Sequence, residues 1–190
     1  MFVLVVLPSM GSTKMRLSSV ELSSMAKDNF RYRTQKILQI LLVVYVGLTL
    51  VETVLLRMAG MSWFEAVCNS FSTIATGGFC TRNASIAAYG SLWIEMIVVF
   101  FMAVSGLHFG LIFATLTGKS NNIFRSEISR YYVLSLLFGG LIVSVSLWAS
   151  DMYPTFASSM RYGFFQVVSV SSTTGFATAD SSVWTPLAIM

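Results

Sequence analysis

Apolar residues run almost without interruption through three long stretches of the chain, residues 37–56, 92–117 and 131–150. The last stretch has no charged residue, and the other two carry one acid each, Glu52 near an end and Glu95 near a start. About 20 helical residues cross the hydrocarbon core of a bilayer. Each stretch therefore predicts a membrane-spanning helix, with both acids near the same interface.

The two connections between these spans, residues 57–91 and 151–183, are also partly apolar. Each is too long for a hairpin turn and too short to cross the membrane twice. We therefore predict that each enters as a half-helix and returns as an extended segment, which requires a lined cavity because backbone at that depth needs polar partners. A capping box at Ser62-Trp63-Phe64-Glu65 predicts the first half-helix over 63–74. The run from Ser158 to about Ser171 predicts the second.

A repeat relates the two connections, because shifting the chain by 97 residues aligns them without a gap. The matches cluster after the half-helices, where Thr76-Gly77-Gly78-Phe79-Cys80-Thr81 falls on Thr173-Thr174-Gly175-Phe176-Ala177-Thr178. Outside this cluster the matched serines are Ser62 with Ser159, Ser72 with Ser169, and Ser85 with Ser182. The predicted unit is helix, re-entrant pore loop, helix, and it occurs twice.

Composition places the chain in the membrane class. Hydrophobic residues make up 55% and charged residues 11% of the sequence, and the mean hydropathy is +0.75, whereas soluble domains have about a quarter charged residues. The expected fold is an all-α integral membrane protein that contacts the lipid bilayer. We expect no nucleic-acid partner, because the basic residues are confined to loops.

The distribution of basic residues predicts orientation. Nine of the twelve Lys and Arg lie in two stretches, 11–36 and 118–130, which the positive-inside rule makes cytoplasmic. The pore loops then enter from the outside of a plasma (inner) membrane. The expected segments are the end of a preceding transmembrane helix (1–10), a cytoplasmic basic loop (11–36), a pore unit (37–117, loop 62–82), a cytoplasmic linker (118–130) and a second, truncated pore unit (131–190, loop 158–180, then the start of a last helix).

The Thr and Gly cluster after each half-helix has the chemistry of a cation filter. A dehydrated potassium ion needs several inward-facing oxygens, which an extended Thr-Gly strand supplies from its backbone carbonyls. Glycine allows the required backbone angles, and the preceding half-helix points its negative dipole end at the cavity. The candidate ion-binding residues are Thr76, Gly77, Gly78, Phe79, Thr173, Thr174, Gly175 and Phe176.

The segments Ser72-Thr73-Ile74-Ala75-Thr76-Gly77-Gly78-Phe79 and Ser171-Ser172-Thr173-Thr174-Gly175-Phe176-Ala177-Thr178 resemble the second and third pore loops of the Trk/Ktr/HKT potassium transporters, the TrkH family most closely. The resemblance implies a pore-forming subunit for potassium uptake, with four such units around one pore. It also implies a cytoplasmic nucleotide-binding TrkA-type regulatory subunit and a homodimer at full length. Potassium is the expected substrate, and no cofactor is expected.

Two other functions deserve comparison. A cation channel subunit that forms its pore by oligomerisation would carry the same loops. An intramembrane enzyme would use Ser105 and His108, but Ala103 stands where a GxSG motif needs glycine, and a base one turn away on the same helix cannot easily address a substrate. We therefore expect no enzymatic activity. Gly106 and Gly110 instead form a GxxxG pair suited to close helix packing.

Overall fold

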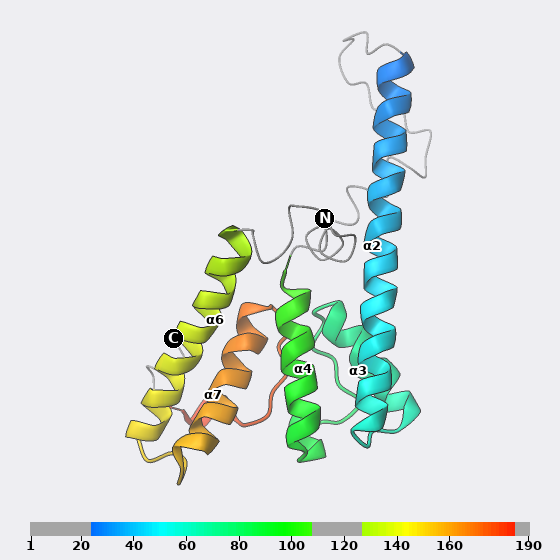
Figure 1. The fold of residues 1–190 in the computed structure, drawn as a ribbon. Coiled ribbons are helices and arrows are strands. Elements are labelled where there is room, and N and C mark those ends of the chain that lie inside the picture. The colour runs from blue at the N-terminus through cyan, green and yellow to red at the C-terminus, as the bar shows by residue number, and fades with distance from the viewer. Residues whose placement is uncertain (1–23, 108–126, 185–190) are drawn as a thin grey trace. The chain divides into compact units, whose positions relative to one another are not determined.

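The computed structural model describes residues 24–107 and 127–184, and in these ranges the protein is all-α, without β-strands. Figure 1 shows the elements. They are α2 (Ser24–Met58), α3 (Trp63–Ile74), the short 3-10 helix η1 (Ser85–Tyr89), α4 (Leu92–Ser105), α6 (Glu127–Ala149), α7 (Phe156–Ser171) and η2 (Ser181–Val183). The predictions for residues 1–10, for most of the linker at 118–130 and for the start of a last helix lie outside the described residues.

The chain divides into two units, residues 1–43 and residues 44–190. The described part of the first unit is helical from Ser24 onward. Residues 24–36, which the sequence predicted to be part of a loop, therefore belong to helix α2. The prediction was wrong there because it weighed charge alone, whereas this stretch has no proline or glycine to end a helix.

Two of the three predicted spans are present as single helices. Leu38–Met58 and Ser129–Ala149 are both long and apolar enough to cross a membrane. The predicted span 92–117 is not one uninterrupted helix, because α4 ends at Ser105 and Gly106 and Leu107 form a turn. The Tyr132 hydroxyl fills the space where a Cβ of residue 106 would lie, so glycine at this position allows the close contact. Residues 108–117, with His108 and Gly110, lie outside the described residues.

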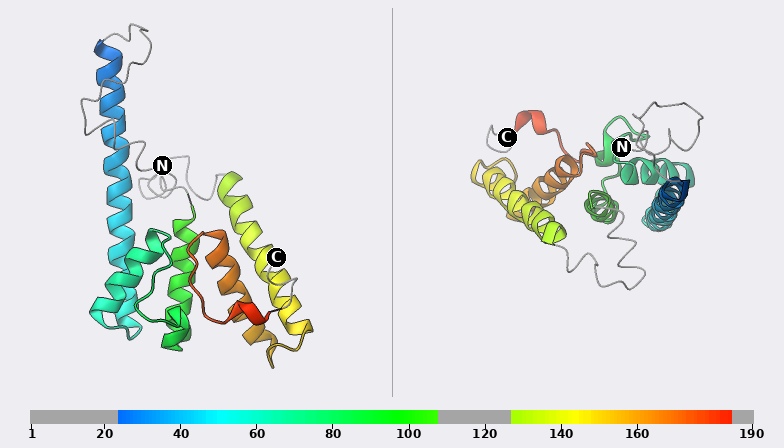
Figure 2. Two further views of the ribbon diagram at one scale, coloured as in Figure 1. Left: turned by 180° about the vertical axis from the view of Figure 1, so that it is seen from behind. Right: turned by 90° about the horizontal axis from the view of Figure 1, so that it is seen from above.

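In the second unit α4 lies between the two half-helices, with α3 on one side and α7 on the other, and α7 packs along α6 (Figures 1 and 2). The apolar core gathers side chains from these helices and from the loop after α7. Its fully buried members include Leu56, Met61, Ile86, Val98, Met102, Phe165, Val168 and Phe176. Burial of this surface fixes both half-helices against one central helix.

Helix α3 spans the predicted range 63–74, and its capping box is confirmed. The Ser62 hydroxyl accepts a hydrogen bond from the Glu65 N–H at 3.3 Å, and a Glu65 carboxylate oxygen accepts from the Ser62 N–H at 3.3 Å. Helix α7 begins at Phe156, two residues before the predicted start, because Thr155 rather than a later residue is its N-cap. Ser159, which the repeat aligned with Ser62, therefore lies inside the helix and has no equivalent capping role.

Candidate functional site

The two half-helices end in the same backbone turn. The C-cap residues Ala75 (φ −77°, ψ −3°) and Ser172 (φ −80°, ψ −2°) have almost identical angles. Three hydrogen bonds close each turn, from residues 75, 76 and 77 to Phe71, Thr73 and Ser72, and from residues 172, 173 and 174 to Val168, Val170 and Ser169. Every partner in one set lies 97 residues from its counterpart in the other. The local sequence therefore specifies one conformation at both places.

Left-handed backbone follows each turn. Thr76 has a φ of 51° and Thr173 a φ of 61°, and Gly78 and Gly175 have φ values of 70° and 84°. A β-branched residue in this region is an outlier that costs about 1–3 kcal/mol, and such strain gathers at functional sites. Two strained threonines at matched positions point to a role for the loops beyond connecting helices.

The two loops also touch each other. A Cβ added to Gly78 would collide with the backbone carbonyl oxygen of Thr174. Farther along, the Ala87 N–H donates to the Ala177 carbonyl at 3.2 Å, and the Ala177 N–H donates to the Ser85 hydroxyl at 3.2 Å. The structure thus places Gly78 of the first loop beside Thr174 and Gly175 of the second.

The surroundings of the two loops differ although their backbones agree. Phe176 is fully buried in the core, whereas Phe79, at the matching position, is 83% exposed. Thr174 is buried, while Gly77, at its matching position, is exposed. In the second loop, buried Thr174 and Phe176 therefore alternate with exposed Thr173 and Gly175, whereas no residue from Thr76 to Phe79 is buried.

Side-chain hydroxyl groups form hydrogen bonds within the second loop and between it and α7. The Ser169 hydroxyl donates to the Phe176 carbonyl at 2.7 Å, and the Ser172 and Thr174 hydroxyls are 2.8 Å apart. The first loop lacks this support, because the hydroxyl of Ser72, the counterpart of Ser169, is buried without a hydrogen-bond partner among the described residues. Its support comes from a different group of residues.

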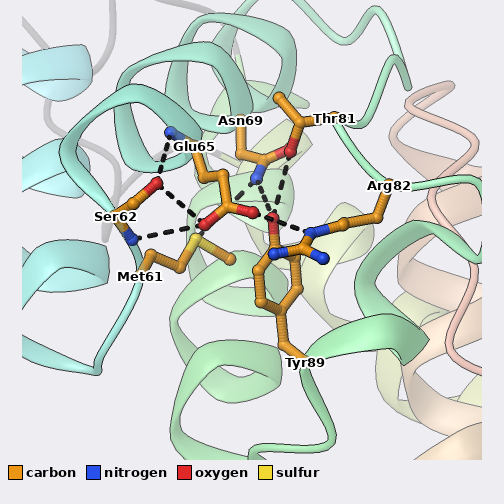
Figure 3. A network of polar contacts seen from close by, with 7 residues as sticks. All are labelled: Met61, Ser62, Glu65, Asn69, Thr81, Arg82 and Tyr89. Carbon is orange, nitrogen blue, oxygen red and sulfur yellow. Dashed lines mark hydrogen bonds and ion pairs between the residues drawn. The ribbon is translucent and has the colours of Figure 1, made fainter.

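That group includes residues of the first turns of α3 and is drawn in Figure 3. Arg82, which follows the first loop, donates from Nε to a Glu65 carboxylate oxygen at 2.7 Å. The Ser62 hydroxyl, followed by the Arg82 guanidinium, lowers the pKa of Glu65 below its ordinary value. The Tyr89 hydroxyl lies between Asn69 and Thr81, at 3.2 and 3.1 Å. The sequence analysis predicted the cap but did not identify Asn69 or Tyr89. One signal for Asn69 was present, because position 166, which matches it in the other half-helix, is also a polar amide, Gln166.

The geometry defines an all-α membrane protein in which two half-helices deliver strained Thr-Gly loops to one place. The family model of TrkH, described as a cation transport protein, matches residues 1–145. The chain therefore belongs to the TrkH family.

Individual relatives agree with this assignment. The chain is 35% identical over 181 residues to the Trk system potassium uptake protein TrkH of Salmonella typhimurium, and 36% identical to its namesake from Halomonas elongata. These alignments cover 94% of this chain but only 38% and 37% of the relatives. The crystal structure of the potassium transporter TrkH from Vibrio parahaemolyticus superposes with a TM-score of 0.76 at 30% identity, over 80% of this chain and 33% of that one.

Proposed function

We propose that this chain contributes two pore loops to a potassium-uptake protein of the cell membrane. The main support for this proposal is the matched pair of strained turns, in which Thr76 and Thr173 both have left-handed backbone just after the ends of the half-helices. The names of the relatives, which are potassium uptake proteins, support potassium as the substrate. Because the chain spans less than two-fifths of those relatives, we propose a role for it within a larger pore.

In the proposed mechanism the two loops replace the hydration shell of the ion. Backbone carbonyls and threonine hydroxyls of Thr76, Gly77, Gly78 and Phe79, and of their counterparts Thr173, Thr174, Gly175 and Phe176, are the candidate ligands. The C-terminal ends of α3 and α7 lie directly before these loops and carry partial negative charge, which favours a cation there. No residue of this set needs to titrate or to form a covalent bond.

The orientation and the partners belong to the same proposal. The basic stretches 11–36 and 118–130 face the cytoplasm, and the pore loops open to the outside. A nucleotide-binding TrkA-type subunit docks on the cytoplasmic side, and two full-length copies associate. The relatives' designation as parts of a Trk system supports more than one component.

One observation favours a second candidate, a cation channel subunit that completes its pore with further copies. Phe79 is 83% exposed although Phe176, at the matching position, is fully buried, so its ring is available to pack against an apolar surface outside the described residues. Either another part of the same polypeptide or another copy of the chain would supply that surface.

Growth and ion uptake distinguish these functions. The natural gene is expressed in bacteria that lack their own potassium-uptake systems, and growth on low potassium is measured together with rubidium uptake. We expect rescue by the natural gene product and none by the 190-residue chain expressed alone at the same membrane level. Rescue by the 190-residue chain would favour the channel subunit, and no ion uptake by either would refute both.

A further inference from the structure

We propose that Tyr89 is a positioning residue for the first filter loop, acting through its hydroxyl, which ties the half-helix α3 to the chain leaving the loop. This inference rests on the proposed ion-conducting role of the loop. The three residues involved, Asn69, Thr81 and Tyr89, come from α3, from the segment after the loop and from η1.

The direction of the hydrogen bonds follows from chemistry. The Asn69 amide nitrogen can only donate, so the Tyr89 oxygen accepts its hydrogen at 3.2 Å. The Tyr89 hydrogen is then free for the Thr81 hydroxyl, whose oxygen is 3.1 Å away. The tyrosine hydroxyl therefore accepts one hydrogen bond from the helix and donates one to the segment after the loop, which connects the two.

The bridge is anchored at a buried residue. Asn69 is completely buried in α3, and the other contact of its amide nitrogen is the weak acceptor Met61 sulfur at 3.7 Å. The Tyr89 ring packs against the apolar core, and the guanidinium of Arg82 lies over it at 5.9 Å from the ring centre. Thr81, two residues beyond Phe79, is exposed and has no other side-chain hydrogen bond among the described residues. The bridge thus links the buried Asn69 to the exposed segment at Thr81.

Comparison with the second loop shows why the first needs this bridge. The second loop is held by the Ser169 hydroxyl on the Phe176 carbonyl, whereas the corresponding Ser72 hydroxyl makes no such bond. Conversely, the hydroxyl of Thr178, the counterpart of Thr81, is buried without a hydrogen-bond partner among the described residues, whereas the Thr81 hydroxyl bonds Tyr89. The side-chain oxygens of Asn69 and of its counterpart Gln166 are both unpartnered there, so at this pair only the Asn69 nitrogen, with its bond to Tyr89, marks the first loop. The two loops therefore share one backbone but have different side-chain supports.

The test compares variants of the natural gene product that differ by one hydroxyl. Tyr89→Phe keeps the ring over which Arg82 lies and removes the hydroxyl that forms the bridge. Tyr131→Phe, at a 72% exposed tyrosine of α6, is the matched control. Rubidium and sodium uptake are measured at equal surface expression. We expect Tyr89→Phe to lower the rubidium-to-sodium uptake ratio about five-fold, the factor that corresponds to one hydrogen bond of ordinary strength, and Tyr131→Phe to leave it unchanged.

A second pair of variants tests the other end of the bridge. Thr81→Val should lower the ratio as Tyr89→Phe does, Thr81→Ser should preserve it, and the double variant Tyr89→Phe with Thr81→Val should be no worse than either alone. If Tyr89→Phe fails to reach the membrane, the difference between Thr81→Val and Thr81→Ser decides the question.

Failure of this inference is distinguishable from failure of the proposed function. Unchanged ratios in Tyr89→Phe and Thr81→Val, while Gly78→Ser lowers the ratio, would overturn the role of Tyr89 and leave the filter in place. Unchanged ratios in all of them, Gly78→Ser included, would remove the filter assignment and this inference with it.

Discussion

Arg161 of α7 donates two hydrogen bonds to the Glu95 carboxylate of α4, from Nε at 2.6 Å and from Nη2 at 2.7 Å. The carboxylate is almost completely buried and the guanidinium is partly exposed, with side-chain exposures of 5% and 31%. This bidentate ion pair joins helix α7 to helix α4. Position 64, which matches Arg161 in the first half-helix, is Phe, so the first half-helix has no such anchor.

Breaking this pair should destabilise the protein strongly. Arg161→Met leaves the Glu95 carboxylate buried without its partner, and loss of one member of a buried pair costs about 3–5 kcal/mol. Arg161→Lys should recover only part of this stability, because an ammonium group cannot donate the two parallel hydrogen bonds of a planar guanidinium. The measurement is thermal unfolding of the purified protein in detergent.

The double variant Glu95→Met with Arg161→Met is the control for this prediction. It removes the unpaired charge as well as the pair, so it should be more stable than Arg161→Met. A double variant no more stable than Arg161→Met would show that the side chains act separately.

The two filter glycines should respond unequally to the same substitution. Gly78→Ala and Gly175→Ala both place a Cβ on left-handed backbone, but only the first drives it into the Thr174 carbonyl, whereas the space at Gly175 is open among the described residues. We expect potassium uptake to fall in both variants and to fall further in Gly78→Ala. Rubidium uptake at equal surface expression checks the order.

The control for the glycine series should be Gly47→Ser. Nothing lies within 4 Å of a Cβ at this helical position, whereas at Gly139, another glycine of a span, an added Cβ would lie 3.2 Å from Val167. Gly47→Ser should keep normal uptake. Equal losses in Gly47→Ser and Gly78→Ala would mean that any added side chain impairs the protein and that the filter geometry is not special.

The cap of α3 should weaken in acid. The pKa of Glu65 is lowered from its ordinary value of 4.5 by the Ser62 hydroxyl and by Arg82. A lowered pKa means that the ionised form is favoured in the folded protein, so the stabilisation is complete above about pH 4.5 and is lost as the pH falls through the lower folded value. The stability advantage of the natural protein over Glu65→Gln should shrink in that range.

Melting temperatures measured from pH 7 down to about pH 3, a range that spans ordinary carboxyl titration, test this expectation. Glu127→Gln, at an exposed acid of α6, is the matched control. An advantage over Glu65→Gln that stays constant across the whole range would contradict the proposed role of the ionised carboxylate.

Membrane orientation can be tested with single cysteines after replacing Cys68 and Cys80 with serine. Arg57→Cys and Asn83→Cys are exposed near the outer ends of α2 and of the first loop, and Arg130→Cys is exposed near the start of α6. An impermeant thiol reagent added outside intact cells should label the first two and spare the third. The reverse pattern would invert the proposed orientation.

Local signals predicted the half-helices well. The range of α3 followed from its capping box, and the shared end of both half-helices followed from the repeated Thr-Gly cluster, because turns and caps depend on neighbouring residues. The early end of α4 could not be predicted, because the apolar pattern continues past Ser105 and the packing of Tyr132 against Gly106 becomes visible only in three dimensions.

The candidate site was predictable only in its backbone. Its eight candidate residues were predicted from composition and spacing, and the structure shows matched left-handed backbone in both loops and a close approach of Gly78 to Thr174. The side chains that support them, Tyr89 for one loop and Ser169 for the other, depend on tertiary contacts. The sequence offers no rule for choosing between such supports.

The half-helices differ in length at one end only. α3 has 12 residues and α7 has 16, yet both finish in the same turn with matched hydrogen bonds. The additional turn of α7 is therefore accommodated at its N-terminal, capped end, at Thr155. Insertions and deletions in this protein should be tolerated between residues 150 and 155. A single residue added between Ser171 and Ser172 would shift the hydrogen bonds from residues 172 to 175 to residues 168 to 170 out of register.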